Sequence, residues 1–540
     1  MLGGDEEAPV HERGVQLSGA IIDGMLDLFG AELPHGAAIH HCACTGLLIL
    51  EDAQIQGSLS LTGSVVAGIH GDRVVVIGNV NLNEGFKAAG ELKFDLAQIG
   101  GNLNCNAGEF GPHDGAAITL NGAKISGDFF ALGLRAFGEV RLLGAQFSGN
   151  FACHGAQLDA GVGKALSADR CVIKGSIFLS HGFRARGIIR LNAAQTEGSV
   201  YCEGASFEGG CEGALDADRL VVKGDLRLSA GFKAVGEVFL LGARIGGNLN
   251  CSGGSFTATH GNALSADGIV VMRAVFFREG FEAHGTVRLI GAKIGGGFSC
   301  RGGLLKAASG DTLLLDGAEV GGTLHFCNLR APAQRVSLDS ATVGALLDDA
   351  AAWGDQLRLN GFVYRGFAAG AFTETPARLQ WLDRQQDFRP QPWLQLQKVL
   401  RESGRFEDAR QVAIAFENRL RKQNLIGIAP AGSNAGLAWC YRIAARVFHW
   451  AFGVLTGYGY RPMRLLFWVG CAWLLCGAAC WFVALPPRGV FAPSDPLVFQ
   501  HPDYAVCNPA NSEPPAADVR GAGNWYLCEK LREEYPPASE

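Results

Sequence analysis

The stretch that decides the fold is "GEVFLLGARIGGNLNC" (Gly236–Cys251), because it returns along the chain at a fixed distance. Its copies are "GEVRLLGAQFSGNFAC" (Gly138–Cys153), "GIIRLNAAQTEGSVYC" (Gly187–Cys202), "GTVRLIGAKIGGGFSC" (Gly285–Cys300) and an earlier "GELKFDLAQIGGNLNC" (Gly90–Cys105). The leading glycines lie 48 or 49 residues apart. A fixed period of this length is the signature of a repeat protein, so the fold has to be derived from one unit.

Each unit contains a second, weaker copy of itself. "RCVIKGSIFLSHGF" (Arg170–Phe183) and "RLVVKGDLRLSAGF" (Arg219–Phe232) repeat the same order of apolar residues around one glycine. Counted by such glycines, a unit of 49 residues holds two coils of 22 to 26 residues. Short alternating apolar runs separated by glycine indicate strands and tight turns. The sequence therefore predicts a mainly β fold, a right-handed parallel β-helix in which each coil stacks on the last.

The repeat domain is expected to span residues 14–366, after an N-terminal tail of residues 1–13. This length gives roughly fourteen coils and, at ~4.8 Å per coil, a rod of about 70 Å. Glycine supplies 76 of the 540 residues. We expect these glycines at corners, where a positive φ is needed and a side chain would obstruct the next coil.

The repeat resembles the pentapeptide-like β-helices of bacterial membrane-anchored proteins, some of which are labelled membrane-associated oxidoreductases. The resemblance rests on the pattern "A-x-I-x-G-x-L" and covers most of the chain. It implies a bacterial protein at a membrane. We find no dinucleotide-binding glycine motif, no CxxC pair and no Walker loop, so no cofactor is predicted from the residues.

Two columns of residues recur with the repeat. Cys105, Cys153, Cys202, Cys251 and Cys300 stand on alternate coils, ~9.6 Å apart, which is too far for disulfides and fits a buried stack of reduced thiols. Asp72, Asn121, Asp169, Asp218 and Asp267 form the second column. Because each recurs alone rather than in a cluster of carboxylates, we expect an Asx-turn residue and not a catalytic or calcium site.

Basic residues form a stripe that we expect to face outward as an interaction surface: Lys87, Arg135, Arg184 and Lys233, with Glu282 at the next place. Lys93, Arg141, Arg190 and Arg288 add a partial second stripe. The nearby glutamates Glu91, Glu139 and Glu237 favour a solvated face over a surface for a polyanion. The net charge of −6 also gives no global attraction to nucleic acid.

The motif "HHCAC" (His40–Cys44) is the one dense cluster of metal-ligating residue types. In a single strand, His40, Cys42 and Cys44 would share a face, but a spacing of ~6.7 Å keeps them from one tetrahedral zinc without a ligand from another coil. We expect buried or edge residues of an early coil. A metal site here would be the place for oxidoreductase chemistry.

From Thr375 onward the apolar residues recur with a helical period, and residues 367–430 are predicted to form a helical hairpin. Pro392 marks the first turn of one helix, Gly404 its end, and a second helix runs from about Phe406 to Lys422. Apolar residues can join the two helices: Trp393, Leu394, Leu396, Val399 and Leu400 against Ala409, Val412, Ala413 and Phe416. The hairpin would cap the open end of the solenoid. It also resembles the helical segment that follows the repeats in the membrane-anchored proteins.

Residues 431–485 are predicted to contact a membrane twice. In "LAWCYRIAARVFHWAFGVL" (Leu437–Leu455), Arg442, Arg446 and His449 form one narrow polar face, which is typical of a helix in the bilayer interface. Leu465–Leu485 has 21 residues without a charge, enough to cross ~30 Å of hydrocarbon. Basic residues precede this span, and only Arg488 follows closely. This bias predicts a repeat domain in the cytoplasm and a Pro-rich tail, residues 486–540, outside the inner membrane.

Two further expectations concern this region. Ala472, Cys476, Cys480 and Ala484 recur at every fourth residue, a small-residue stripe that lets helices approach closely and predicts homo-oligomers. Cys507 and Cys528 could form a disulfide in an oxidising periplasm.

The triplet Gly457–Gly459, "GYG", matches the selectivity filter of potassium channels. A filter needs a pore loop between two spanning helices, whereas this triplet precedes the one convincing span. In repeat-plus-membrane proteins of this kind a similar "GYG-x-R-P" stands before the first span, so we expect a break that redirects the chain. Relatives of this kind often continue into further spans; this sequence shows no second hydrophobic segment, so it is either a single-pass form or an incomplete one.

Three functions are compatible with these residues. The first is a membrane-anchored cytoplasmic scaffold that binds a protein partner along the solenoid and has no identifiable catalytic site. The second is a membrane-associated oxidoreductase or another metal-dependent or polysaccharide-directed enzyme, which requires metal at His40, Cys42 and Cys44 or an acidic groove. The third is a subunit of an ion channel or membrane sensor. We favour the first, because repeat surfaces normally bind partners.

Overall fold

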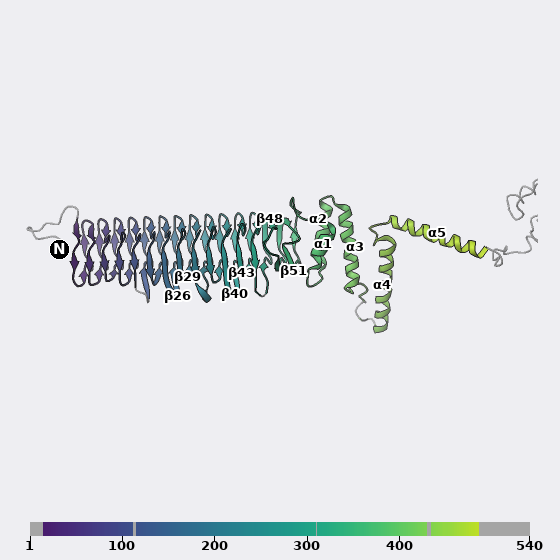
Figure 1. Cartoon of the computed structure of the whole chain (residues 1–540), viewed down its shortest axis with the longest axis horizontal. Coiled ribbons are helices and arrows are strands. Elements are labelled where there is room, and N and C mark those ends of the chain that lie inside the picture. The colour runs from purple at the N-terminus through teal and green to yellow at the C-terminus, as the bar shows by residue number, and fades with distance from the viewer. Residues whose placement is uncertain (1–13, 112–114, 309, 429–431, 433, 485–540) are drawn as a thin grey trace, which may run out of the picture. The chain divides into compact units, whose positions relative to one another are not determined.

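The computed structural model describes residues 14–484, apart from 112–114, 309, 429–431 and 433. The fold is mainly β: a parallel β-solenoid of about 15 turns is followed by five helices, as Figure 1 shows. The strands run from β1 (Val15–Ser18) to β52 (Val363–Tyr364). The helices are α1 (Thr375–Asp383), α2 (Pro390–Glu402), α3 (Phe406–Lys422), α4 (Ala435–Thr456) and α5 (Met463–Ala484). The predicted β-solenoid is confirmed, with about one coil more than expected. The chain divides into two compact units, residues 1–424 and 425–540.

One coil consists of four very short strands. In a representative coil these are β34 (Val221–Val222), β35 (Leu226–Arg227), β36 (Lys233–Val235) and β37 (Val238–Phe239). The first two belong to a 28-stranded sheet, called sheet A here, and the last two to a 24-stranded sheet, sheet B. Each strand pairs in parallel with its counterpart in the next coil, so that Leu226 lies opposite Leu249 and Val238 opposite Leu264. Every backbone ladder therefore runs along the axis of the solenoid.

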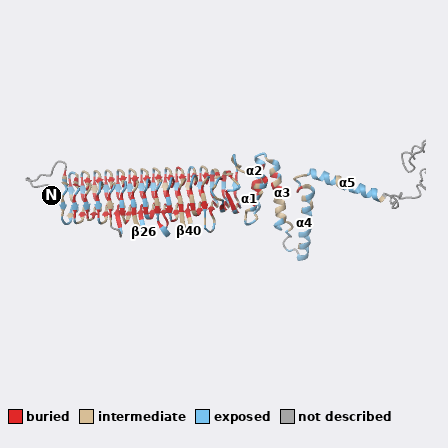
Figure 2. Ribbon diagram, in the orientation of Figure 1, coloured by how far each residue is buried: buried red, intermediate tan, exposed pale blue. Residues whose placement is uncertain are grey.

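The core is a set of apolar columns inside the coil. Figure 2 shows buried residues along the whole length of the solenoid. Phe207, Phe232 and Phe256 are each 0% exposed, and their ring centroids lie 5.1 and 5.4 Å apart from one coil to the next. The buried side chains form one continuous cluster that begins at Leu33 and includes residues of α2 and α3. Stacking of coils, rather than any single coil, removes this surface from water.

The alternation of short and long coils has one cause, an insertion at the same corner of sheet B. The segment between the two sheet-B columns runs from Gln157 to Leu166 in a long coil but only from Arg184 to Ile189 in the next, short coil. The extra residues protrude as loops, with residues 159–164 and 257–262 as examples, and Figure 1 shows such projections at β26 (Gln157–Ser167) and β40 (Ser255–Ser265). The repeating unit is two coils because every second coil carries a loop.

The prediction that each corner glycine needs both a positive φ and room for the next coil is corrected, because the two requirements do not apply at every position. Gly224, in the column that counts the coils, has no positive φ; a Cβ there would come within 2.8 Å of the carbonyl oxygen of Gly198. Gly187, which leads a unit, does have a positive φ of 113°, and its Cβ would meet the carbonyl oxygen of Gly163 at 2.5 Å. The first is glycine because coils stack closely; the second because a loop of the preceding coil lies directly on it.

Three helices, rather than the predicted two, follow the last coil. The helices α2 and α3 have the expected bounds and pack through buried Leu396, Val399 and Val412. Leu394 does not join this contact, since it is 50% exposed. The additional helix, α1, buries Trp381 and Leu382 in the same cluster as Trp353 of the last strands. The cap therefore continues the solenoid core instead of only covering it.

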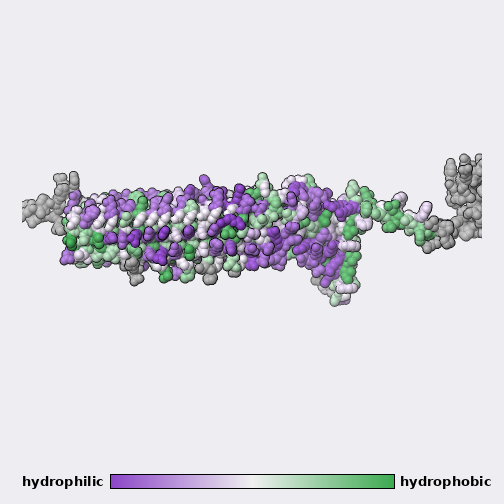
Figure 3. Space-filling model, viewed as in Figure 1, coloured by the Kyte–Doolittle hydropathy of each residue, from purple (hydrophilic) through white to green (hydrophobic). Residues whose placement is uncertain are grey.

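Residues 425–540 form the second unit, of which α4 and α5 are described. Both helices expose large apolar side chains, with Phe448 74% and Trp473 76% exposed. Met463–Val483 of α5 has a mean hydropathy of 1.9 and is long and apolar enough to cross a membrane. Figure 3 shows these helices as a hydrophobic stretch of the surface.

Candidate interaction surfaces

The predicted basic stripe lies on one outer column of sheet B. Its members Lys87, Arg135, Arg184 and Lys233 are all exposed, as expected. They occupy alternate, short coils, and each is separated from the next by a residue of the intervening long coil: Glu109, Gln157 and Ser206. The column thus alternates cations with acidic or neutral side chains, an interleaving that follows from the stacking register.

The intervening residues reduce the positive charge of the half with Lys87 and Arg135 and leave the half with Arg184 and Lys233 basic. Lys87 Nζ and Arg135 Nη1 each lie 3.7 Å from the same carboxylate oxygen of Glu109. Only Ser206 separates Arg184 from Lys233, and within the described part of the chain neither cation has a salt bridge. Between Arg184 and Lys233 this column therefore carries two cations without an acidic member of the column between them.

The second predicted stripe is largely neutralised. Lys93 Nζ lies 2.6 Å from Asp72, Arg190 Nη2 lies 2.9 Å from Asp169, and Arg288 Nη2 lies 2.6 Å from Asp267. Arg141 pairs with Glu139 at 2.8 Å. Lys93, Arg190 and Arg288 are held by the carboxylate column of the preceding coil, so they serve the stacking of coils. Arg141 pairs within its own strand instead, and the second stripe as a whole leaves little charge for a partner.

The loops of the long coils line the basic column. Each loop begins directly after a long-coil member of the column, as loop 159–164 does after Gln157. Because loops and cations alternate, Arg184 lies between the long coils that carry loops 159–164 and 208–213. Val162, at the tip of the first loop, is 95% exposed. This side of sheet B therefore combines charged residues, exposed apolar side chains and protruding loops, the features by which a repeat protein distinguishes partners.

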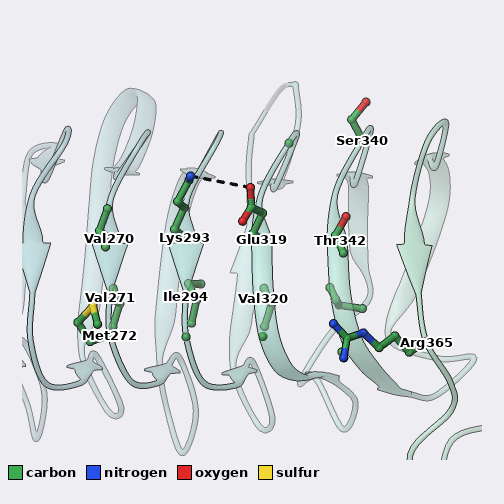
Figure 4. Close-up of a pocket in the computed structure, with 15 residues that line it drawn as sticks. Val270, Val271, Met272, Lys293, Ile294, Glu319, Val320, Ser340, Thr342 and Arg365 are labelled. Atoms are coloured by element: carbon green, nitrogen blue, oxygen red, sulfur yellow. Dashed lines mark ion pairs between the residues drawn. The ribbon is translucent and has the colours of Figure 1, made fainter.

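A shallow groove of about 520 Å³ lies on sheet A near the last coils. Figure 4 shows Lys293 and Glu319 on adjacent strands of this groove, with their charged atoms 4.0 Å apart, and Arg365 beyond Thr342. Gly295, Gly321 and Gly344 line it without side chains. The groove offers one weak ion pair and one further cation among mainly apolar and glycine lining residues, and among the described residues it places no nucleophile beside a base.

Aromatic side chains occupy an outer column of sheet A. The rings of Phe178 and Tyr201 are stacked at 4.9 Å with an interplanar angle of 4°, and Arg227 lies over Tyr201 at 5.2 Å. His154 lies 5.0 Å from the other side of Phe178. These three rings cover one another's faces, so this part of the column leaves little free ring face of the kind on which a sugar stacks.

The predicted metal candidates do not share one strand. His40 ends β5 (Ala37–His40) of sheet A, whereas Cys44 lies in β6 (Ala43–Cys44) of sheet B. The chain turns between them at His41, which has a positive φ of 52°. Cys42 and Cys44 are buried, and Cys42 Sγ donates to the carbonyl oxygen of His40 at 3.2 Å. The expectation of one common face is wrong because the motif spans a corner. Among the described residues no group of three or more His, Cys, Asp or Glu side chains is arranged to hold a metal ion.

The cysteine column is buried as predicted. Cys105, Cys251 and Cys300 are each 0% exposed, and all five members are free thiols. Burial in an apolar stack raises the pKa of Cys105, Cys202, Cys251 and Cys300, because a thiolate would lose its hydration there. Cys171, another buried thiol, has its pKa raised to about 12 mainly by burial. These thiols are structural and unreactive.

The carboxylate column has a different role from the predicted Asx-turn. Asp218 Oδ1 accepts a hydrogen bond from the backbone N–H of Leu241 in the next coil, at 2.9 Å. The column equivalents Asp72, Asn121, Asp169 and Asp267 accept from residues of the next coil at 3.0 to 3.2 Å. The side chain thus points along the solenoid axis and joins two coils at a corner, where it supplements the backbone ladder.

The most buried charged pair was not predicted. Arg378 of α1 donates to both carboxylate oxygens of Asp348, the last residue of β50 (Thr342–Asp348). Both side chains have 0% exposure, and Trp353 Nε1 donates to the same carboxylate at 2.9 Å. Arg378 also lies over Phe372 at 3.7 Å and Phe367 at 4.2 Å. An arginine in a short helix without a clear apolar face carries no signal that would have revealed this contact.

The turn between α4 and α5 contains the "GYG" triplet. Gly457, Tyr458 and Gly459 all have a positive φ, of 59°, 57° and 81°. The N–H of Gly459 donates to Thr456 Oγ1 at 3.0 Å, and the ring of Tyr458 lies 4.5 Å from that of His449. The triplet therefore ends α4 and redirects the chain. Of the predicted helix stripe, Ala472, Cys476 and Cys480 are exposed on α5, which also contains Ala484. Cys507 and Cys528 lie outside the described residues.

Comparison of the chain with protein-family models, with curated proteins and with solved structures found no match.

Proposed function

We propose that this protein is a membrane-anchored scaffold whose β-solenoid binds a protein partner along the basic column of sheet B. The observation that carries the proposal is the edge around Arg184 and Lys233, where two unpaired cations alternate with protruding loops. A continuous core through about 15 turns makes this edge a fixed array instead of a flexible one. The partner surface should be acidic and extended, because the cations stand two coils apart, about 9.6 Å.

The helix α5 supports the proposed membrane anchoring. Apart from Arg464 near its start, the helix carries apolar or small residues on all sides, with Leu466 68% and Trp481 72% exposed, which suits lipid as the surroundings. The helix α4 carries Arg442 and Arg446 on an otherwise apolar surface, which supports a place in the interface. With the basic residues before α5, the solenoid would lie in the cytoplasm of a bacterium, and residues 486–540 outside the inner membrane. The exposed Ala472, Cys476 and Cys480 would then join α5 to a second copy.

Membrane anchoring is tested by fractionating cells that express the full chain and the chain ending before α5. We expect the full chain in the membrane fraction after an alkaline wash, and the shortened chain in the soluble fraction. Protease added outside intact cells should leave the solenoid uncut. A solenoid degraded from outside would overturn the proposed topology.

Partner binding is tested with residues 1–424, which form one compact unit with its own core. A variant with Lys87, Arg135, Arg184 and Lys233 changed to Glu should lose a bound protein that wild type retains in a pull-down quantified by mass spectrometry. The matched control reverses four exposed cations in or beside the strands of sheet A: Lys124, Lys174, Arg244 and Arg273. We expect the control to keep the partner. Equal loss in both variants would mean that net charge, and not the column, governs binding.

A further inference from the structure

The charges of residues 425–484 are all of one sign. This segment, which contains α4 and α5, has no aspartate or glutamate and four arginines: Arg442, Arg446, Arg461 and Arg464. Arginine keeps its positive charge throughout the physiological pH range. The acidic residues that follow in the sequence come after α5, so in the proposed topology the bilayer separates them from the arginines. Within the segment, therefore, no carboxylate balances the four positive charges.

In α4 the cationic side chains lie on one narrow face. Arg442, Arg446 and His449 follow at i, i+4 and i+7 and fall within about 60° of the helix circumference. The other sides carry apolar residues, among which Leu437 and Phe448 are 69% and 74% exposed. No residue of this helix is buried, and Figure 2 shows its surface open along its length. We call Arg442, Arg446 and His449 the cationic face of α4.

The turn after α4 extends this face with a tyrosine. The ring of Tyr458 lies 4.5 Å from that of His449, and a Cβ added to Gly453 would come within 2.4 Å of Tyr458 Cζ. Because Gly453 stands one turn after His449, the tyrosine ring covers the next place along the cationic face. Tyrosine is enriched where acyl chains meet lipid headgroups, since its ring is apolar and its hydroxyl polar. We therefore expect the headgroup layer at the level of the cationic face.

We propose that the cationic face of α4 binds the phosphate groups of acidic phospholipids, so that the protein gathers anionic lipid around its anchor. A guanidinium group donates two parallel hydrogen bonds to a phosphate. In an acidic phospholipid the phosphate charge is unbalanced, whereas in phosphatidylcholine an ammonium group of the same headgroup balances it. The arginines therefore gain more from the acidic lipid. The inference rests on the proposed membrane anchoring and names the class of lipid that α4 binds.

Lipid selection is measured on the full chain, reconstituted in vesicles of phosphatidylcholine with a minor share of phosphatidylglycerol. After brief extraction in mild detergent, mass spectrometry of the lipids that stay on the protein gives their ratio, which is compared with the ratio in the vesicle. We expect wild type to enrich phosphatidylglycerol by about threefold or more, from two arginines at the headgroup layer. The double variant Arg442→Gln with Arg446→Gln should bring the ratio back to that of the vesicle.

Two control variants distinguish the cationic face from charge in general and from damage to the helix. Arg401→Gln with Lys422→Gln removes the same charge from exposed positions of α2 and α3 and should keep the enrichment. Arg442→Lys with Arg446→Lys keeps the charge of the face and should enrich phosphatidylglycerol more than the glutamine variant does. Loss in the glutamine variant alone supports the proposal. No enrichment in wild type, equal loss in the α2–α3 control, or complete loss in the lysine variant would overturn it.

A flotation assay separates failure of lipid selection from failure of the anchor. Wild type and the glutamine variant are floated with vesicles of phosphatidylcholine alone after an alkaline wash. Both should stay with the vesicles, because α5 is unchanged and needs no acidic lipid. Wild type that floats but shows no enrichment in the mixed vesicles would overturn the role of α4 and leave the anchor standing. Wild type that does not float would overturn the anchoring and, with it, this inference.

Discussion

Arg378 and Asp348 form a two-pronged ion pair with no exposed side-chain surface, at 2.8 and 2.7 Å. The pair joins α1 of the cap to the end of β50 in the solenoid. A buried charge is tolerated only while its partner and its hydrogen bonds are in place, and here Trp353 completes the shell of the carboxylate. The cap is therefore fixed to the last coils by an ion pair in which removal of either side chain leaves the other charge buried and unpaired.

Arg378→Met should destabilise residues 1–424 by about 3–5 kcal/mol, because it leaves the Asp348 carboxylate buried and unpaired. Urea unfolding followed by circular dichroism measures this loss. The matched control is Arg410→Met, which removes a pair with Glu407 whose side chains are 44% and 53% exposed and should cost at most about 1 kcal/mol. Similar losses in the two variants would show that the buried pair is not important for the cap.

Gly224→Ala should destabilise the solenoid by about 1–3 kcal/mol, because the added Cβ would press on the backbone of the preceding coil. Gly366→Ala is the control, since its φ is not positive and no heavy atom lies within 4 Å of an added Cβ. The control should be neutral or slightly stabilising. Thermal unfolding of both variants distinguishes close stacking from a general intolerance of alanine.

The stability of the Asp218→Asn variant should increase relative to that of wild type as the pH rises. Burial is the largest cause that raises the pKa of Asp218, so the folded state holds this proton more tightly than the unfolded state does. The stability that the protonated carboxyl contributes is complete below its unfolded pKa and is lost as pH rises through the raised folded pKa. Asparagine keeps the acceptor for the N–H of Leu241 without the charge, as Asn121 does in the same column.

Unfolding free energies of wild type and Asp218→Asn, measured from pH 3 to pH 8, check this sign. Asp218→Ala is the comparison, since it loses the inter-coil hydrogen bond and should cost about 1 kcal/mol even at high pH. A difference between wild type and Asp218→Asn that stays constant with pH would contradict the raised pKa.

Thiol labelling should detect one fast cysteine in residues 1–424. Cys211, in loop 208–213, is exposed, whereas the other free cysteines of this unit are buried in the described structure. Burial also raises the pKa of the stacked thiols, so thiolate, the reactive form, is scarce there. A thiol reagent should therefore react rapidly once, Cys211→Ser should abolish this phase, and the remainder should react only on unfolding. Several fast thiols in the variant would indicate that the cysteine column opens readily.

The repeat made most of the fold predictable. Glycine spacing and alternating apolar residues act locally, so the recurring copies of "GEVFLLGARIGGNLNC" and of the weaker pattern before it predicted the coils, their stacking, the buried cysteines and the outward direction of Lys233. The helices α2, α3 and α5 could be predicted for the same reason, because proline, glycine and apolar periodicity lie within each segment. Helix α1 was missed, since it is short and has no comparable pattern.

The relations between coils were decided only by the tertiary structure. The neighbours of Arg135 and Lys233 depend on the register between adjacent coils. That register is kept although every second coil of the repeat contains an inserted loop. Asp218 could be recognised as a corner residue, but its acceptor role depends on Leu241 one coil further on. The contact of Arg378 with Asp348 depends on how a helix closes the last coil. Sequence patterns predict the local structure of each coil. The ion pairs and side-chain hydrogen bonds also depend on which residue of the adjacent coil lies opposite, and the sequence of one coil does not contain that information.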